Sequence, residues 1–471
     1  RSKVVTFNYQ SSSNSLICTK DIEYTHSLSG LGRSINLVTS METTDQNDVF
    51  RMDYTYKNPL VHIQGKGFLG FQEYTTLDET LGTETISSFG CHSAYYYPYL
   101  SNKIIRTLQG DSISTEFYRT YCVSNGSVHS KAFIPYTEEH SCYDVVRGIR
   151  TWTTQTIDEF GNPLQVLTSS LGGFGKKITT TYNNYTTGIW LIGQPATVTT
   201  HISTSSNSVI DKQTITYNSQ QLPEHIVSYT YDGTRQVSEE TINYYSNGNV
   251  MSHSVTPYAS SDVLTTTYQY SGNNTYCSCV TDQYSQSTNY SYDAFGRLKK
   301  VTEPTGLTTT YTYDGLDRIV QEETNDTVII STAWNWNTES LDPLYCKTVS
   351  GNDGSSQKTW YDAFGREVRN STLGYDGVEL KTDRQYDANG RLWRVSLPYK
   401  SGHATKWNSY TYDYLGRIEG EYYANGKEVS YTYSGNTVTS TEDGIQVTKY
   451  YNQRGELIKI EIGRASCRER V

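Results

Sequence analysis

Three glycines in the first hundred residues have the spacing of a dinucleotide-binding loop, Gly65-x-Gly67-x-x-Gly70. Such a loop needs a strand before it and a helix after it, because the helix N-terminus holds the phosphates. Here the segment that follows, FQEYTTL, reads as another strand. We therefore predict a backbone turn and no nucleotide cofactor. The large apolar residues of the segment are expected to pack into a sheet: Phe68, Leu69 and Phe71.

The cysteines do not form a recognisable metal site or disulfide framework. Cys277-x-Cys279 has only one intervening residue and no second pair, which falls short of zinc-ligand spacing. Without Cys467, seven cysteines remain, an odd and sparse set for a chain of 471 residues. We predict no metal site. The cysteines do not indicate whether the protein works in an oxidising or a reducing compartment.

Adjacent acidic residues are the other candidates for chemistry: Glu138-Glu139, Glu239-Glu240 and Glu322-Glu323. Two carboxylates that flank one glycosidic bond could hydrolyse it, but neighbours on a strand point to opposite faces. We expect these acids to be solvated. Histidine is scattered and serine is abundant, so no catalytic triad can be inferred. The sequence predicts no catalytic residue, and the protein is not expected to be an enzyme.

Composition narrows the class of protein. Hydrophobic residues make up 35% of the chain, charged residues 19%, and the mean hydropathy is −0.61. Tyrosine is unusually frequent, at 43 of 471 residues, which is too aromatic for a disordered chain. No apolar run approaches the roughly 18 to 20 residues of a membrane-spanning helix. The net charge of −10 argues against a nucleic-acid or anionic-membrane partner.

The two ends indicate a piece of a longer protein. The chain begins with Arg1, and any export signal is expected upstream of it. The last residues, 462–471, resemble a translated sequencing adapter and do not share the Tyr- and Thr-rich composition of the rest of the chain. We leave them out of the fold prediction. Removing their three arginines and one glutamate changes the net charge from −10 to −12.

A repeated motif, Tyr-Asp-x-x-Gly-Arg, dominates the C-terminal part of the chain. Its strong copies begin at Tyr292, Tyr313, Tyr361, Tyr386 and Tyr412, at intervals of 21, 48, 25 and 26 residues. The long interval predicts one degenerate copy within it. Weaker copies begin at Ile157, Tyr244 and Tyr451. A period of roughly 20 to 25 residues indicates one supersecondary unit stacked on its neighbours.

Each unit is predicted to form a β-hairpin. Tyr alternates with Thr before the motif, as in Tyr311-Thr312-Tyr313, and both residue types favour strands. The aspartates suit the first position of a type I turn: Asp293, Asp314, Asp362, Asp387 and Asp413. The glycines supply the left-handed residue of the following bulge: Gly296, Gly365, Gly390 and Gly416. The arginines restart a strand and can pair with the aspartates or with tyrosine faces: Arg297, Arg318, Arg366, Arg391 and Arg417.

Successive hairpins of this kind pair edge to edge into one long antiparallel sheet. A sandwich or small barrel needs an aliphatic face, whereas many strands here present Tyr and Thr. Tyrosine buries a large ring while its hydroxyl remains in contact with water, so rows of Tyr can stabilise a sheet that is solvated on both faces. The predicted fold is all-β, a long curved β-sheet mostly one layer thick, with few helices.

The motif copies resemble the YD repeats of RHS proteins, the polymorphic-toxin family related to toxin-complex B and C subunits and, more distantly, to teneurins. A second match is NPLVHIQGKGFLGFQEYTTLD, from Asn58 to Asp78, which is similar to a GKGFLGF-type segment of bacterial members. The resemblance covers about residues 50 to 460. It implies a hollow β-shell that encloses a C-terminal toxin, with no cofactor.

The resemblance also sets expected domains and partners. Residues 1–140 would be an N-terminal β region that leads into the shell, and residues 141–461 the repeat sheet. The implied partners are the protein's own C-terminal toxin domain and secretion or delivery components, at the surface of a bacterium or outside it. The family's self-cleaving Asp-Pro-x-Gly motif is missing, because Asp342-Pro343 is followed by Leu344.

Two functions of different class are left open. The first is a structural shell that encapsulates and delivers a toxin. The second is a surface adhesin or carbohydrate-binding repeat protein, in which exposed aromatic residues stack on sugar rings: Trp334, Trp336, Trp393 and Trp407. Composition does not separate the two, and the family resemblance favours the shell.

Overall fold

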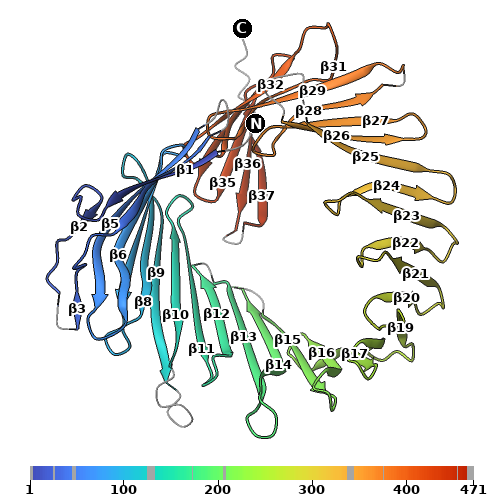
Figure 1. Cartoon of the computed structure of the whole chain (residues 1–471), viewed down its shortest axis with the longest axis horizontal. Coiled ribbons are helices and arrows are strands. Elements are labelled where there is room, and N and C mark those ends of the chain that lie inside the picture. The colour runs from blue at the N-terminus through green and yellow to red at the C-terminus, as the bar shows by residue number, and fades with distance from the viewer. Residues whose placement is uncertain are drawn as a thin grey trace.

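The computed structural model describes residues 4–24, 27–44, 49–124, 133–171, 173–204, 208–336, 344–374, 376–452 and 455–463. All regular secondary structure in these ranges is β-strand (Figure 1). Within them no helix is long and apolar enough to cross a membrane. The expected all-β architecture is therefore confirmed.

The first part of the chain forms these strands: β1 (Val4–Ser11), β2 (Cys18–Thr19), β3 (Leu28–Ser29), β4 (Asn36–Thr44), β5 (Val49–His62), β6 (Gly67–Asp78), β7 (Thr83–Cys91), β8 (Pro98–Thr107), β9 (Ser112–Ser124), β10 (Phe133–Asp144), β11 (Ile149–Ile157), β12 (Pro163–Ser170), β13 (Gly175–Tyr185), β14 (Leu191–Ser203), β15 (Ser208–Tyr217), β16 (Pro223–Thr230), β17 (Arg235–Tyr244) and β18 (Val250–Pro257).

The second part forms these: β19 (Leu264–Tyr270), β20 (Cys277–Thr281), β21 (Ser287–Tyr292), β22 (Leu298–Thr302), β23 (Thr308–Tyr313), β24 (Ile319–Thr324), β25 (Ile329–Trp336), β26 (Tyr345–Gly351), β27 (Ser356–Tyr361), β28 (Glu367–Leu373), β29 (Glu379–Tyr386), β30 (Leu392–Ser396), β31 (Tyr399–Lys400), β32 (Trp407–Tyr412), β33 (Ile418–Tyr422), β34 (Glu428–Ser434), β35 (Thr437–Glu442), β36 (Ile445–Tyr451) and β37 (Leu457–Gly463).

The strands follow one another in chain order as an antiparallel meander. From β4 to β30, each strand pairs with the next in sequence, and β1 pairs with β4. The short strands β2 and β3 both pair with the long strand β5. The meander forks once, at β29, which pairs with β31 through Leu380 and Lys381 and with β30 through Arg384 to Tyr386. Strand β32 then pairs with β30, and the meander continues to β37.

The sheet bends because its hairpins carry a bulge at the same place. Ser291 pairs with Lys300, but Tyr292 pairs with Leu298, so Lys299 is left without an opposite residue. The same register shift falls at the tyrosine of the other strong motif copies, for example between Thr312 and Tyr313. A bulge bends its strand and increases the local twist. Repeated at one edge of the sheet, these bends add up to the arc in Figure 1.

The wall is one layer thick. Its solvent-accessible surface is 28489 Å², whereas a globular protein of 53.3 kDa would expose about 18,000 Å². Few apolar side chains are buried, and they do not form one continuous core: Cys18, Leu37, Leu60, Cys346 and Val429. The prediction of a curved, single-layered sheet is confirmed.

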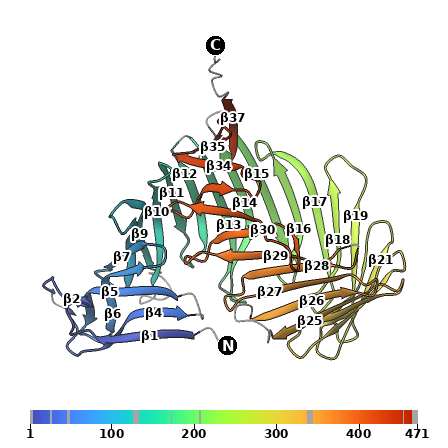
Figure 2. The same ribbon diagram turned by 90° about the horizontal axis from the view of Figure 1, so that it is seen from above.

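The arc comes round far enough for its two parts to touch (Figures 1 and 2). Phe50, at the start of β5, packs edge-on against Phe364 in the turn between β27 and β28, with ring centroids 4.9 Å apart. The same Phe50 ring lies 3.5 Å from the position that a Cβ would take at Gly390. A second contact joins the turns that contain Gly435 and Arg147. A Cβ placed on Gly435 would lie 3.8 Å from the carbonyl oxygen of Arg147. The sheet is therefore a coil whose hairpin tips meet earlier hairpins.

The expected domain limits fall inside strands. The limit between residues 140 and 141 lies within β10, and the limit between residues 461 and 462 lies within β37. In β37, Ile462 pairs with Val447 and Gly463 with Gln446, although both were left out of the fold prediction. Residues 464–471 lie outside the described residues.

Candidate functional site

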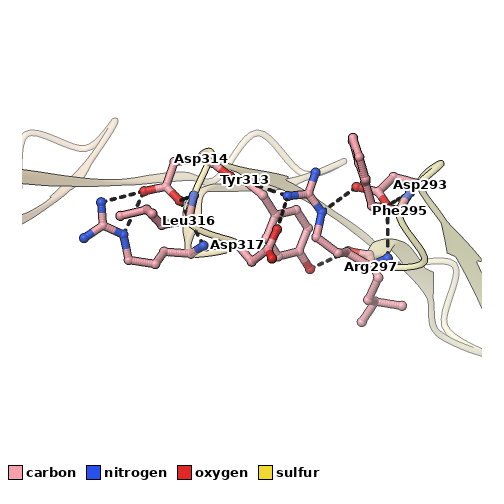
Figure 3. A network of polar contacts seen from close by, with 9 residues as sticks. Asp293, Phe295, Arg297, Tyr313, Asp314, Leu316 and Asp317 are labelled. Carbon is pink, nitrogen blue, oxygen red and sulfur yellow. Dashed lines mark hydrogen bonds and ion pairs between the residues drawn. The ribbon is translucent and has the colours of Figure 1, made fainter.

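The turn of each strong repeat is built around its aspartate. In the turn after β21, one carboxylate oxygen of Asp293 accepts hydrogen bonds from the backbone N–H groups of Phe295, at 2.9 Å, and Arg297, at 3.0 Å (Figure 3). The other oxygen accepts a hydrogen bond from Arg297 Nε at 2.7 Å. The backbone closes the turn, because Gly296 N–H donates to the Asp293 carbonyl at 3.1 Å. One carboxylate thus organises five consecutive residues.

The other strong copies repeat this geometry. Each aspartate accepts from the arginine four residues later through both backbone and side chain: Asp314 from Arg318, Asp362 from Arg366, Asp387 from Arg391, and Asp413 from Arg417. The glycines have φ angles of 82° at Gly296, 78° at Gly365, 75° at Gly390 and 77° at Gly416. In the second copy Asp317 takes the glycine position with a φ of 60°. Its carboxylate also accepts a hydrogen bond from Arg297 Nη1 at 2.7 Å.

Arg318 favours the ionised form of the Asp314 carboxylate. The side-chain hydrogen bond from Arg318 lowers the pKa of Asp314 below its usual value, and backbone donors from Arg318 and Leu316 lower it further. Charge-assisted hydrogen bonds of this kind are about twice as strong as neutral ones. The turn is therefore most stable when its aspartate is charged.

The same arginine reaches forward to the next repeat. The guanidinium of Arg297 lies 4.6 Å from the centroid of the Tyr313 ring, and the Tyr313 hydroxyl donates to the Leu298 carbonyl at 2.7 Å. Arg366 lies over Tyr386 at 4.6 Å, and the Tyr386 hydroxyl donates to the carbonyl of Glu367 at 2.8 Å. Burial raises the pKa of both Tyr313 and Tyr386, so their hydroxyls stay protonated donors. Each repeat is thus fastened to the one before it.

This tyrosine ladder extends beyond the strong copies. Arg391 lies over Tyr412 at 4.7 Å and Arg417 over Tyr433 at 4.1 Å. Tyrosine hydroxyls of the earlier strands make the same bond to a backbone carbonyl: Tyr182 to Pro163, Tyr217 to Pro195, and Tyr244 to Pro223. Sequence reasoning missed Tyr182, Tyr217 and Tyr433. For Tyr182 the available signal was the proline about 20 residues upstream that begins β12. For Tyr217 the accepting proline, Pro195, lies inside β14.

The degenerate copy expected in the long interval corresponds to the hairpin of β25 and β26. Arg318 reaches forward to Trp334 there, at 5.0 Å from the ring centroid, so an indole replaces the tyrosine ring. The turn of this hairpin falls in residues 337–343, outside the described residues. After it, Tyr361 stacks on Tyr345 with ring centroids 4.9 Å apart.

The glycine-rich segment forms a turn and a bulge. Gly65, Gly67 and Gly70 all have positive φ angles, 114°, 75° and 105°, and β6 begins at Gly67, so no helix follows. Phe71 packs against Tyr56, with ring centroids 4.7 Å apart. Leu69 is the extra residue of a bulge, since Leu60 pairs with Gly70 and Val61 with Phe68. Phe68 is 48% exposed, and its ring packs edge-on against Phe71 with centroids 5.4 Å apart.

Two pairs of adjacent acids have side-chain partners, an arginine for one pair and histidines for the other, whereas the sequence predicted solvated acids. A bulge after Thr137 brings Glu138 and Glu139 to one arginine, with Arg119 Nε 3.0 Å and Nη2 2.9 Å from their carboxylates. The opposite-face rule fails there because it assumes an unbroken pleat. Glu239 and Glu240 do point to opposite faces, where they contact His225 at 2.7 Å and His253 at 2.9 Å. Strand β17 is thereby fastened to both neighbours.

Within the described residues, no three His, Cys, Asp or Glu side chains gather as a metal site would require. Cys277 and Cys279 are both free and half-buried in β20. The carboxylates and guanidinium groups described above satisfy one another, and this geometry can hold a sheet together.

A family model for the RHS repeat matches residues 290–327, which contain the first two strong turns. The chain therefore contains RHS/YD repeats. No curated protein sequence matches it significantly. Its fold is similar to the crystal structure of TcdB2-TccC3, with a TM-score of 0.71, 10% identity, and coverage of 97% of this chain and 35% of that chain.

Two further structures of the same complex agree. TcdB2-TccC3-TEV matches with a TM-score of 0.73, 10% identity, and coverage of 97% of this chain and 37% of that chain. TcdB2-TccC3-Cdc42 matches with a TM-score of 0.73, 10% identity, and coverage of 98% of this chain and 37% of that chain. The RHS-repeat protein thus spans about a third of the length of these chains, and at this identity the likeness concerns the fold.

Proposed function

We propose that this RHS-repeat protein is a section of the wall of a shell that encapsulates a C-terminal toxin and delivers it. The observation that carries the proposal is the coil itself, one layer thick, which matches TcdB2-TccC3-Cdc42 over 98% of its length with a TM-score of 0.73. The wall residues have a structural role, and neither the glycine-rich segment nor the repeat turns bind a cofactor.

A wall of this kind suits an enclosing function for a physical reason. Each hairpin is stabilised by its turn and by the neighbouring hairpin, so neither face needs a hydrophobic core behind it. A sheet that needs no second layer can surround a large volume with few residues. The proposed contents are the protein's own toxin domain, and the proposed setting is the surface or surroundings of a bacterium, where delivery components act.

The test begins with the gene. Resequencing the source DNA across the codon for Glu461 and about two kilobases beyond would show how the reading frame continues. We expect further YD repeats, an Asp-Pro-x-Gly segment and an unrelated small domain. The complete protein is then expressed and treated with protease, and the small domain should be cut only after the wall is denatured. A reading frame that encodes a wall anchor in place of a toxin would contradict the proposal.

The second candidate is a carbohydrate-binding surface protein, and exposed indoles favour it. Trp336 is 72% exposed and Trp393 is 44% exposed. Cations already lie over three of the four indoles: Arg318 and Lys347 over Trp334, and Arg394 over both Trp393 and Trp407. A wall anchor downstream, together with glycan affinity at Trp336, would favour this candidate.

A further inference from the structure

Arg394 in β30 is held between two tryptophans. Its guanidinium carbon lies 4.3 Å from the ring centroid of Trp393 and 4.4 Å from that of Trp407 in β32. Nε donates to the side-chain oxygen of Gln385 in β29 at 2.8 Å. Three neighbouring strands thus fix the plane and orientation of one half-buried guanidinium.

This arginine has no carboxylate partner among the described residues, unlike the arginines of the repeat turns. Arg297, Arg366 and Arg417 each lie 2.7 Å from the aspartate of their own turn. The hydrogen bond to Gln385 uses Nε alone, and the structure gives the Nη atoms of Arg394 no other hydrogen bond or ion pair. A guanidinium carries five N–H donors in a rigid fork that matches a carboxylate. Arg394 is therefore oriented for an anion that this part of the chain does not supply.

The residues around Arg394 indicate which kind of anion would fit. Trp393 is 44% exposed, so part of its indole stays open to a ligand beside the guanidinium. Lys406, next to Trp407, is exposed and adds positive charge. A flat aromatic face next to a fixed guanidinium fits a molecule that has a broad apolar face and a carboxylate at its rim. A pyranose ring with a carboxyl group has this shape, since its axial C–H bonds form the apolar face.

We propose that Trp393, Arg394 and Trp407 form a binding site for an acidic sugar residue of a glycan. The carboxylate of the sugar binds the Nη side of Arg394, and its ring stacks on the open part of Trp393. A carboxylate on a peptide side chain would engage the arginine alone and leave the indole without a role. The site is a means of attachment to an acidic glycan, and it is independent of whether the wall encloses a toxin.

The test uses a matched pair of probes and the whole chain. Binding of a galacturonic acid trimer is measured by calorimetry and compared with its methyl ester, which keeps the rings and removes the charges. Because charge-assisted bonds to arginine are roughly twice as strong as neutral ones, we expect the acid to bind about tenfold more tightly. Equal affinity for acid and ester would overturn the proposal.

Two variants separate the site from the fold. Arg394→Lys keeps the charge but loses the planar fork, and it should weaken acid binding about tenfold. Gln385→Glu places a carboxylate against Arg394 and should compete with the sugar without loss of melting temperature, so it stays informative if another variant is unstable. Unchanged acid affinity in a folded Gln385→Glu protein would count against the proposal.

Two controls test the sugar and the indole. Trp393→Ala should weaken binding of both acid and ester, whereas Trp190→Ala, which removes a more exposed indole just before β14, should leave both unchanged. Equal losses in the two variants would point to nonspecific stacking and overturn the assignment. A glutamate hexamer that binds as tightly as the trimer would show a carboxylate site with no preference for sugars, which would also overturn it.

Discussion

The two parts of the wall differ in strand length and in where their side-chain bonds lie. Strands β4 to β18 have 8 to 14 residues, whereas β19 to β37 have 2 to 8. In the long-strand part, ion pairs link neighbouring strands along their length, as between Lys103 and Glu116 or between Arg106 and Glu84. In the short-strand part, ion pairs between strands also occur, as between Arg369 and Asp383, but each strong repeat turn adds a bond between its own aspartate and arginine.

The difference shows two ways to stabilise one sheet. A long strand gains one backbone hydrogen-bond pair for about every two residues, so its turns can vary in sequence. A strand of five or six residues has few such bonds, and an isolated two-stranded hairpin is marginal in water. The short hairpins offset this through a strong turn and a tyrosine that fastens each one to its predecessor. The turn motif is therefore strictest where the strands are shortest.

The largest expected effect is at a buried turn aspartate. Asp362 is only 6% exposed and accepts three hydrogen bonds within its turn. Asp362→Ala would remove the carboxylate from the half-buried Arg366 and cost about 3 kcal/mol of local stability. Glu139→Ala, in the long-strand part, should cost at most about 1 kcal/mol, because its partner Arg119 is exposed. Hydrogen exchange of β27–β28 and β9–β10 measures both, and equal losses would remove the distinction between the two parts.

A valine at a turn glycine should have the next largest effect. Gly365 has a φ of 78°, which a β-branched residue adopts only with strain, so Gly365→Val should cost about 2 kcal/mol or misfold the hairpin. The control is Gly315→Val in the preceding strong turn, since Gly315 has an ordinary φ and open space around it. That change should stay within about 0.5 kcal/mol. Melting curves that match for the two variants would contradict the turn assignment.

A smaller effect is expected from exchanging residues between two turns at the opposite edge of the sheet. The turns Glu303–Leu307 and Thr324–Val328 have the same hydrogen bonds, but the left-handed position holds Gly306 in one and Thr327 in the other, with φ of 84° and 76°. Thr327→Gly should stabilise its hairpin by about 1 kcal/mol, and Gly306→Thr should destabilise by a similar amount. Thermal unfolding of both variants checks the signs, and two shifts in the same direction would refute the comparison.

The smallest effect is a difference in acid sensitivity between the two parts. Hydrogen bonds from Arg318 lower the pKa of Asp314 below the unfolded value of 3.8. The resulting stability is complete above that pH and is lost as the pH falls through the lower, folded-state pKa. Near-ultraviolet circular dichroism should therefore change as the pH falls below 3.8, and Asp314→Asn should reduce that change. An acid transition that this substitution leaves unaltered would count against the role of the turn.

The hairpin was predictable because its determinants are local. Asp293, Gly296 and Arg297 lie within five residues, and turn chemistry acts at that range. The same reasoning failed at Glu138 and Glu139, because a bulge depends on how two strands pair and not on either strand alone. Sequence reasoning also could not give the 48% exposure of Phe68, since exposure of an aromatic residue in a single layer depends on what lies across the sheet.

The sequence by itself determined that this chain is a row of hairpins with one kind of turn, and its composition determined that the row is a single layer. Only the tertiary structure decided how far the row curves and where it meets itself. The contact of Phe50 with Phe364 arises from many small bends added over more than twenty strands, and no single repeat encodes that sum. The site around Arg394 has the same origin, because its two indoles and its glutamine come from three strands that meet beside the fork at β29.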